Sequence, residues 1–517
     1  QKSLNFTFNK RQTMQYPNAS TRIISLLIAS LSSCILYSHA FSTPQTPSSN
    51  PPTTPLELRT YFATCIPGLE PALTRELESI NAHNILPMKS GVQFTESPET
   101  NPNCEIGLRS LLWLRTPHRI MELLASSDEN YEEDRLVTAD DLYHFIQSVV
   151  HIPSVLGDGQ GGMQTLAIKA TSGGMLPKEL CHSHFTSLTV KNAIVDACRT
   201  LRSDGERPNI DIKDPDVPLV LALRGWNSGS YATASVYRCL SGHASLHKRG
   251  YREGSAVHKA AMKESLASGL LLESGWDLLV AAAKKDGLGA VLVDPMAGSG
   301  TFCIEAALMA ADVAPGLIRQ RYAEGGKDYI PPAMRWKDYT TTPDTWNALL
   351  TEAIQRRKEG MKWLTDPEST CVIQGNEQYR PALELAKSGS AGAGFNEQSI
   401  TYQNQDCLNY HPPTMIPGRT IVATNPPWGL RLDTDIEESW GSLKQFLRKE
   451  VGGCEAWVLC GNKDLTRILR MKQTKRIPIR TGEEDLRWVQ YHVFPPKVAS
   501  PETDVAENKE EEEVFVQ

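Results

Sequence analysis

Short β-type runs alternate with helical segments throughout the second half of the 517-residue chain. Residues 291–294 form a nearly continuous apolar run, typical of a strand buried on both faces, and a Gly-rich turn and a helix over about 301–311 follow it. This alternation predicts an α/β domain with a doubly wound, mostly parallel sheet, in which ligands bind at the carboxyl ends of the strands. Further strands are predicted at residues 371–375, 400–403, 420–424, 456–460, 476–480 and 487–493, and helices at 381–388 and 438–449.

The Gly-rich turn after residues 291–294 is the first candidate site. Glycines there let the backbone approach a ligand closely, and the following helix offers its free N–H groups. No Gly-Lys-Ser/Thr follows, and Cys303 stands where a dinucleotide fingerprint has its third Gly. An acid before the turn suits a cofactor with a cationic amino acid moiety, such as S-adenosylmethionine; a purely structural tight turn is the alternative. The predicted cofactor-binding residues here are Asp294, Pro295, Gly298, Gly300 and Thr301.

Two more acidic residues follow predicted strands. Glu377 comes after the strand at 371–375, where a carboxylate can accept both ribose hydroxyls of a nucleoside. Asp406 follows the next strand and could accept from an adenine amino group. A plain surface carboxylate is the alternative at either position.

The most specific motif is Asn425-Pro426-Pro427-Trp428, directly after the strand at 420–424. Two prolines fix φ and remove two donors, so the preceding carbonyls can project outward. The Asn425 side-chain oxygen and the Pro426 carbonyl could then accept both hydrogens of an exocyclic amino group, which aims its nitrogen at a methyl donor. Trp428 offers a face on which an extruded base could stack. A strand-terminating turn is the bland alternative.

The first half of the chain has a different pattern. Strands are predicted at residues 61–65, 164–170 and 218–223, and helices at 69–80 and 184–201. This is a small α+β arrangement.

Basic residues interleaved with aromatics occur at 108–120 and 246–252. Such residues can contact phosphates and stack on bases, although a solvated charged face is about as common. The net charge of −7 does not exclude RNA, because it combines a cationic N-terminal segment, an acidic tail and a mildly acidic core whose basic residues lie in local clusters. The predicted RNA-binding residues are Lys248, Arg249, Tyr251, Arg252 and Arg115.

Both ends of the chain have biased compositions. Residues 1–55 contain four basic residues and no acidic one, and the apolar run 23–37 ends near Ala40-Phe41, as at a signal-peptide cleavage site. This pattern resembles the bipartite plastid presequence of diatoms and related algae; a mitochondrial or cytoplasmic protein is the alternative. We expect no stable membrane association after its removal. The acidic end, residues 497–517, reads as a solvated tail. Eleven cysteines without a Cys-x-x-Cys pair predict no metal site.

The motifs resemble those of the THUMP-containing RNA guanine-N2-methyltransferases, and most of all the N-terminal half of the bacterial 23S rRNA methyltransferase RlmL. The resemblance covers about residues 58–495. Three features depart from the family pattern: Asn376-Glu377 after the second strand, Trp428 in place of the commoner Tyr, and an insertion-like segment at 313–370. The stretches that carry the resemblance are 63–70, 114–116, 191–196, 245–252, 294–301 and 424–429.

This resemblance implies a ferredoxin-like plus THUMP RNA-binding region and a class I S-adenosylmethionine-dependent methyltransferase domain. It implies methylation of a guanine N2 in structured RNA and favours large-subunit rRNA. A tRNA guanine-N2 enzyme, an adenine-N6 enzyme and a non-catalytic RNA-binding or ribosome-assembly protein are the alternatives. The expected organisation is a presequence and linker (1–55), the RNA-binding region (56–223), a connecting basic hairpin (224–260), the methyltransferase domain (261–496) and the tail (497–517).

Overall fold

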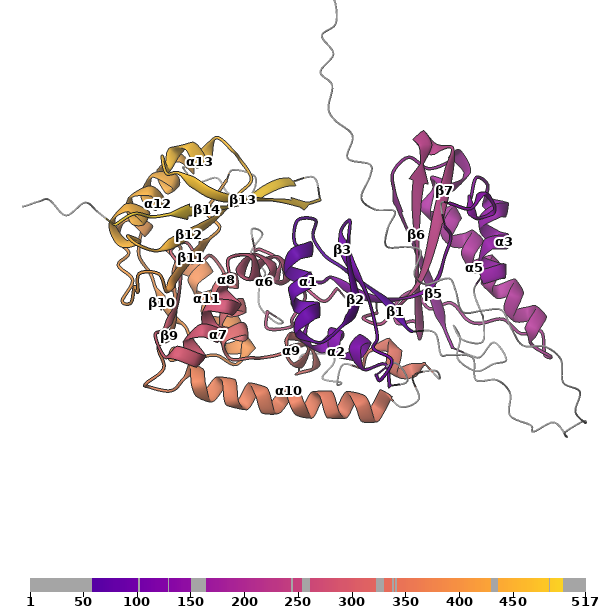
Figure 1. Ribbon diagram of the computed structural model, residues 1–517, viewed down its shortest axis with the longest axis horizontal. Helices are drawn as coiled ribbons and strands as arrows, with labels where there is room; N and C mark the ends of the chain where they lie inside the picture. Colours follow the sequence, from indigo (N-terminus) through magenta and orange to yellow (C-terminus); the bar gives the residue numbers. More distant parts are fainter. Residues whose placement is uncertain are drawn as a thin grey trace, which may run out of the picture. The chain divides into compact units, whose positions relative to one another are not determined.

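Two seven-stranded sheets form the framework of the chain (Figure 1). The predicted presequence and acidic tail lie outside the described residues, so both assignments stay predictions. The computed structural model describes residues 58–100, 103–128, 130–149, 164–242, 245–252, 261–321, 330–336, 339, 342–428, 436–482 and 484–495.

The first half of the first sheet has a ferredoxin-like β-α-β-β-α-β order. Its strands run antiparallel in the order β2-β3-β1-β4. Tyr61 and Ala63 face the core, where α1 and α2 pack. The elements are β1 (Thr60–Thr64), α1 (Glu70–Ser79), β2 (His83–Met88), β3 (Gly91–Thr95), α2 (Glu105–Trp113) and β4 (Arg119–Ser126).

The same sheet continues through β7, β6 and β5, because β7 pairs antiparallel with β4. The hairpin of β6 and β7 spans residues 217–239, so the boundary predicted at residue 223 is wrong: it falls inside β6. Local apolar runs could not reveal this, since pairing with β6 and β4 assigns β7 to the sheet. The elements are α3 (Ala139–Val149), β5 (Leu166–Gly173), α5 (Ser183–Leu201), β6 (Val217–Trp226) and β7 (Tyr231–Cys239).

The second sheet has the order β10-β9-β8-β11-β12-β14-β13. The first five strands run parallel, and β14 is inserted antiparallel between β12 and β13. The predicted doubly wound, mostly parallel sheet is therefore confirmed. Its strands are β8 (Ala290–Asp294), β9 (Cys371–Asn376), β10 (Thr401–Gln403), β11 (Thr420–Thr424), β12 (Glu455–Cys460), β13 (Gln473–Thr481) and β14 (Glu484–His492).

Helices cover both faces of this sheet. Ala290 and Leu292 pack on the side of α6, α7 and α8, whereas Val291 and Val293 pack on the side of α12. Among the described residues no single helix is both long and apolar enough to cross a membrane; α6 and α7 reach that length only together, with a bend of 61° between them. The helices are α6 (Glu264–Glu273), α7 (Trp276–Asp286), α8 (Thr301–Ala310), α11 (Arg380–Ala393), α12 (Ile436–Glu450) and α13 (Leu465–Ile468).

Much of the described part of the insertion-like segment 313–370 packs in the core of the first sheet, although the segment lies between two strands of the second; its two ends, at Val313 and Leu364, pack in the core of the second sheet. Trp336 donates from Nε1 to the Asp216 carbonyl at 2.8 Å, and the Arg238 guanidinium lies 4.0 Å from the centre of the Trp336 ring. The Tyr339 hydroxyl donates to Glu122 on β4 at 2.9 Å. The part of the segment around Trp336 and Tyr339 therefore belongs to the N-terminal core. It comprises α9 (Pro315–Arg321), the short 3-10 turn Pro332–Arg335 and α10 (Thr342–Leu364).

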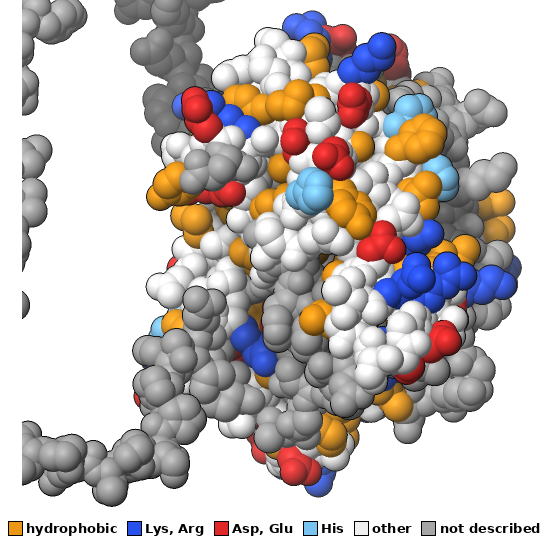
Figure 2. All heavy atoms as spheres, turned by 90° about the vertical axis from the view of Figure 1, so that its right-hand side faces the viewer, with side chains coloured by type: hydrophobic (Ala, Val, Ile, Leu, Met, Phe, Trp, Pro, Cys, Tyr) orange, Lys and Arg blue, Asp and Glu red, His pale blue; other side chains and the backbone are white. Residues whose placement is uncertain are grey.

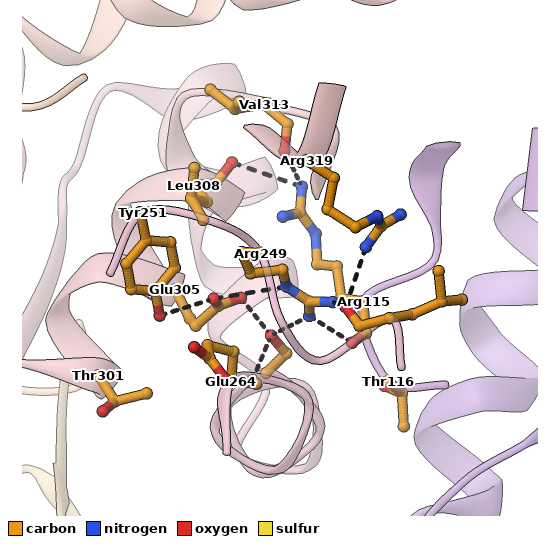
Figure 3. A network of polar contacts seen from close by, with 12 residues as sticks. Arg115, Thr116, Arg249, Tyr251, Glu264, Thr301, Glu305, Leu308, Val313 and Arg319 are labelled. Atoms are coloured by element: carbon orange, nitrogen blue, oxygen red, sulfur yellow. Dashed lines mark hydrogen bonds and ion pairs between the residues drawn. The ribbon is translucent and has the colours of Figure 1, made fainter. Parts of the chain in front are cut away.

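A buried ionic cluster connects the N-terminal region to α8 (Figure 3). The side chains of Arg249 and Glu305 are both fully buried, with Nε 3.6 Å from Oε1. Arg249 also donates to the carbonyls of Leu246 and Arg115, and the Tyr251 hydroxyl donates to Glu305 at 3.1 Å. Buried charges are tolerated only when they are paired in this way.

The cluster corrects the prediction that Arg115, Arg249 and Tyr251 contact RNA. Their exposed fractions are 8%, 0% and 2%. Arg115 donates to the Val313 carbonyl at 3.0 Å instead. An alternation of basic and aromatic residues is the same for a nucleic-acid surface and for a buried network, so the sequence could not separate the two.

Replacing Arg249 with Met should lower the free energy of unfolding by about 3–5 kcal/mol, because Glu305 then stays buried without its cation. The double variant Arg249→Met/Glu305→Leu should recover part of this loss. Urea unfolding followed by circular dichroism measures both. Lys248→Met, at the exposed neighbouring position, is the control and should change stability by less than about 0.5 kcal/mol. If Arg249→Met were as stable as the wild type, the buried pair of Arg249 and Glu305 would not contribute to stability.

Candidate functional site

The Gly-rich turn lies between β8 and α8. Gly298 and Gly300 have φ angles of +55° and +74°, in the region that favours glycine. A Cβ on Gly298 would meet no described atom within 4 Å, whereas one on Gly300 would lie 2.5 Å from the Tyr402 hydroxyl. Gly298 therefore leaves its backbone open to a ligand, and Gly300 allows close packing beneath the turn. Among the described residues no side chain caps α8, so its first N–H groups are available next to this turn.

Asp294 ends β8 and is only 2% exposed. Its Oδ1 accepts from the Met296 N–H at 3.2 Å. Burial, with a smaller contribution from the nearby charge of Glu377, raises the pKa of the Asp294 carboxyl to about 7. A cation placed beside Asp294 would restore the carboxylate form.

Asn376 holds the loops of three adjacent strands together, a role that the motif search missed. Its side chain is 1% exposed and donates to the carbonyls of Pro295 and Gln405, both at 3.0 Å. It accepts in turn from the Gln405 N–H at 3.1 Å. Both amide ends are thus bonded to neighbouring loops. The available signal was a polar side chain at the end of an apolar strand.

Glu377 and Asp406 follow β9 and β10, next to β8 in the sheet. Glu377 accepts from the Gly298 N–H and from the Tyr379 N–H, each at 2.8 Å. Asp406 is exposed and accepts from the Leu408 N–H at 2.7 Å. Because the carboxyl ends of parallel strands share one edge, Asp294, Glu377 and Asp406 lie along that edge.

The Asn-Pro-Pro-Trp loop leaves the sheet at the same edge. It follows β11, which lies beside β8 with Val422 opposite Val293. Asn425 is half-buried, and its Oδ1 accepts from Trp428 Nε1 at 3.0 Å. The structure thus brings the Gly-rich turn and the Asn-Pro-Pro-Trp loop together at the ends of two adjacent strands.

Thr301 and Arg252 belong to the support of the site. Thr301 is 4% exposed in the first turn of α8, and the Arg252 guanidinium donates to its hydroxyl. Arg252 also lies 3.4 Å from Glu264. The prediction of Arg252 as an RNA contact is therefore corrected to an internal role, and Lys248 is the one exposed side chain of the predicted RNA-binding set.

The surface formed by α3 and α5 carries other basic residues. Figure 2 shows Lys and Arg side chains gathered on this face beside His and hydrophobic side chains. The exposed Phe185 lies at edge-on distance from His182, with ring centres 5.5 Å apart. Exposed basic residues of β5 and of the stretch between β5 and β6 are Lys169, Lys178, Arg199, Arg207 and Lys213. The described residues contain no cluster of three His, Cys, Asp or Glu side chains that could hold a metal ion.

Two domain families match the chain. Residues 249–490 match the RMKL-like methyltransferase domain, and residues 60–121 match the RlmL ferredoxin-like domain. The ribosomal RNA large subunit methyltransferase K/L of Syntrophotalea carbinolica is 32% identical over 436 residues, which cover 84% of this chain and 53% of that relative. The corresponding protein of Cellvibrio japonicus is 31% identical over 427 residues, with coverages of 82% and 49%. The chain spans about half the length of the curated relatives it matches.

Solved structures agree on the fold. The crystal structure of "a possible methylase" from Clostridium difficile 630 has a TM-score of 0.65 at 21% identity and covers 86% of this chain and 100% of its own. The structure of SMU.472 complexed with SAH has a TM-score of 0.62 at 19% identity, with coverages of 84% and 98%. These likenesses confirm the predicted class I methyltransferase fold with an N-terminal ferredoxin-like domain.

Proposed function

We propose that this chain, which belongs to the RMKL-like methyltransferases with an RlmL ferredoxin-like domain, transfers a methyl group from S-adenosylmethionine to RNA. The acceptor is the exocyclic N2 of a guanine, and the substrate class is large-subunit rRNA. Relatives named ribosomal RNA large subunit methyltransferase K/L support the rRNA substrate. The motif resemblance supports the guanine N2. Residues 130–242, with their exposed basic and aromatic side chains, are assigned to a THUMP-type RNA-binding module.

One observation carries the proposal: the Gly-rich turn after β8 and the Asn-Pro-Pro-Trp loop after β11 lie side by side at one edge of the sheet. The residues at this edge suit the cofactor. Asp294 can balance a cationic amino acid moiety, and Glu377 and Asp406 provide carboxylate acceptors for a nucleoside. Gly298 leaves room for the ligand against the backbone.

The reaction needs positioning more than acid–base chemistry. S-adenosylmethionine supplies an electrophilic methyl group when it is bound. Asn425 Oδ1 and the Pro426 carbonyl would accept the two amino hydrogens and so direct the nitrogen lone pair toward that methyl group. Among the described residues none donates a hydrogen bond to the Pro426 carbonyl. Pro427 fixes the turn, and the Trp428 ring would stack on the base.

The proposal is tested by transfer of a labelled methyl group from S-adenosylmethionine to fractionated rRNA and tRNA, with mass spectrometry of the modified nucleoside. N2-methylguanosine in large-subunit rRNA is the expected product. Transfer of the label to tRNA would show that tRNA is the substrate instead of rRNA. Detection of N6-methyladenosine would show that adenine is the target base instead of guanine. Binding of RNA without any transfer would support an assembly role instead.

Asn425→Ala should lower kcat at least 100-fold, because one of the two acceptors for the amino group is lost. The affinity for S-adenosylhomocysteine (SAH) should stay within twofold of the wild-type value, since Asn425 follows a different strand from the cofactor turn. Calorimetry and the labelled-methyl assay measure the two quantities. Asn347→Ala, on the exposed side of α10, is the matched control and should keep full activity. Unchanged turnover in Asn425→Ala would overturn the mechanism.

The affinity for SAH should fall as the pH is lowered from 7.5 to 5.5. The Asp294 carboxyl has a pKa of about 7 without ligand, so below that pH a proton must leave before the carboxylate can pair with the ligand's ammonium group. The expected limit is tenfold per pH unit below the pKa of Asp294, because the α-amino group of the ligand is already predominantly protonated over this range. Calorimetry should detect the released proton, and Asp294→Asn should bind more weakly and without this pH dependence. A flat wild-type profile would contradict the assignment.

We also propose that residues 1–55 direct the protein to the plastid of a complex-plastid alga, on the sequence pattern alone. A fluorescent fusion to residues 14–60 should accumulate in plastids. Retention in the secretory pathway, mitochondria or cytoplasm would refute the proposal.

A further inference from the structure

Trp440 is a buried side chain that contacts the Asn-Pro-Pro-Trp loop from outside its motif. It lies on α12, is 0% exposed, and donates from Nε1 to the Pro427 carbonyl at 2.7 Å. A buried indole N–H with a well-placed acceptor fixes both groups, because either would pay a desolvation cost if left unpaired. The hydrogen bond therefore fixes the peptide plane between Pro427 and Trp428.

This bond decides which carbonyl of the loop is engaged internally. Prolines at 426 and 427 donate no N–H, so the loop cannot hold itself with backbone bonds at these positions. Trp440 takes the Pro427 carbonyl, whereas no described residue donates a hydrogen bond to the carbonyl of Pro426, which is therefore the acceptor available to a substrate. The orientation of the reactive acceptor thus depends on a residue of another element.

A second indole hydrogen bond, from Trp428 to Asn425, orients the Asn425 amide. The Trp428 indole N–H can only donate, so the Asn425 atom 3.0 Å away must be the amide oxygen. That contact sets the amide orientation, while a second lone pair of the same oxygen can accept from a substrate. A flipped amide would present N–H groups to an amino group and repel it.

The Trp428 ring packs against Gly461. A Cβ at this position would lie 2.7 Å from Cε3 and 3.1 Å from Cδ2 and Cζ3 of the indole. Any side chain there would displace the ring. Gly461 directly follows β12, the strand beside β11, so the ring rests on the neighbouring strand end.

We propose that Trp440 is a positioning residue for methyl transfer, and that Gly461 leaves the space in which the Trp428 ring packs. The hydrogen bonds Trp440 to Pro427 and Trp428 to Asn425 hold the loop so that the Asn425 oxygen and the Pro426 carbonyl face the target amine. The inference rests on the proposed function, because it concerns the same loop.

Trp440→Phe tests the inference, since it keeps a buried aromatic ring and removes only the donor. We expect kcat to fall about 10- to 100-fold, with the RNA KM and the SAH affinity changed less than twofold. In ¹⁵N-tryptophan-labelled protein the Trp428 indole N–H signal, assigned through Trp428→Phe, should shift. Trp457→Phe is the matched control: Trp457 is 2% exposed, and its indole N–H has no hydrogen-bond partner among the described residues. It should keep the wild-type kcat.

Gly461→Ala provides an independent test through the ring. It should lower kcat and shift the same Trp428 signal without a change in SAH affinity. Gly441→Ala, next to Trp440 in α12, is its control, because a Cβ there meets no described atom within 4 Å. Suppose that Asn425→Ala has the expected loss of kcat, but Trp440→Phe keeps full activity and an unshifted Trp428 signal. This result would overturn the positioning role of Trp440 and leave the proposed function intact. Absence of methyl transfer by the wild type to any RNA would overturn the proposed function and this inference with it.

Discussion

The buried ion pair between Arg249 and Glu305 connects the two sheets of this chain. Charges placed in a core must be paired, so this pair holds the segment 246–252, α8 and the turn around Arg115 together. Arg252 extends the same constraint to Thr301, at the first turn of the helix behind the Gly-rich loop. The contacts that attach the N-terminal region therefore also support the candidate cofactor site. The segment 330–353 adds a second attachment, because Trp336, Tyr339 and Trp346 pack in the N-terminal core.

The site itself follows from parallel pairing. Strands β10, β9, β8 and β11 end at one edge, and each ends in or is followed by a polar residue that the sequence marks: Asp406, Glu377, Asp294 and Asn425. The side chains that hold these residues in place come from other elements. Asn376 ties the loops after β8, β9 and β10, and Trp440 on α12 holds the loop after β11. Chemistry-bearing residues thus lie in short local motifs, while their support is distributed over the domain.

Much of the second sheet could be predicted from the sequence, because its central strands β8, β11 and β12 are buried on both faces and read as continuous apolar runs. The first sheet was harder. β2 is an edge strand with an exposed, Pro-containing sequence, so neither composition nor alternation marks it. β7 belongs to the sheet only through its pairing with β4 and β6. The segment 313–370 reads as an insertion along the chain, yet its aromatic residues complete the core of a distant region.

By itself, the sequence determined the parallel sheet, the Gly-rich turn and the Asn-Pro-Pro-Trp loop, because strand burial and turn chemistry are encoded by neighbouring residues. Tertiary structure decided which charged residues are internal. Arg249 and Lys248 are adjacent and both cationic, but one is fully buried against Glu305 and the other is exposed. The burial of a charge depends on a partner that can lie fifty or more residues away, and local sequence carries no record of that distance. For the same reason only the folded chain shows that Trp440 and Gly461 belong to the site.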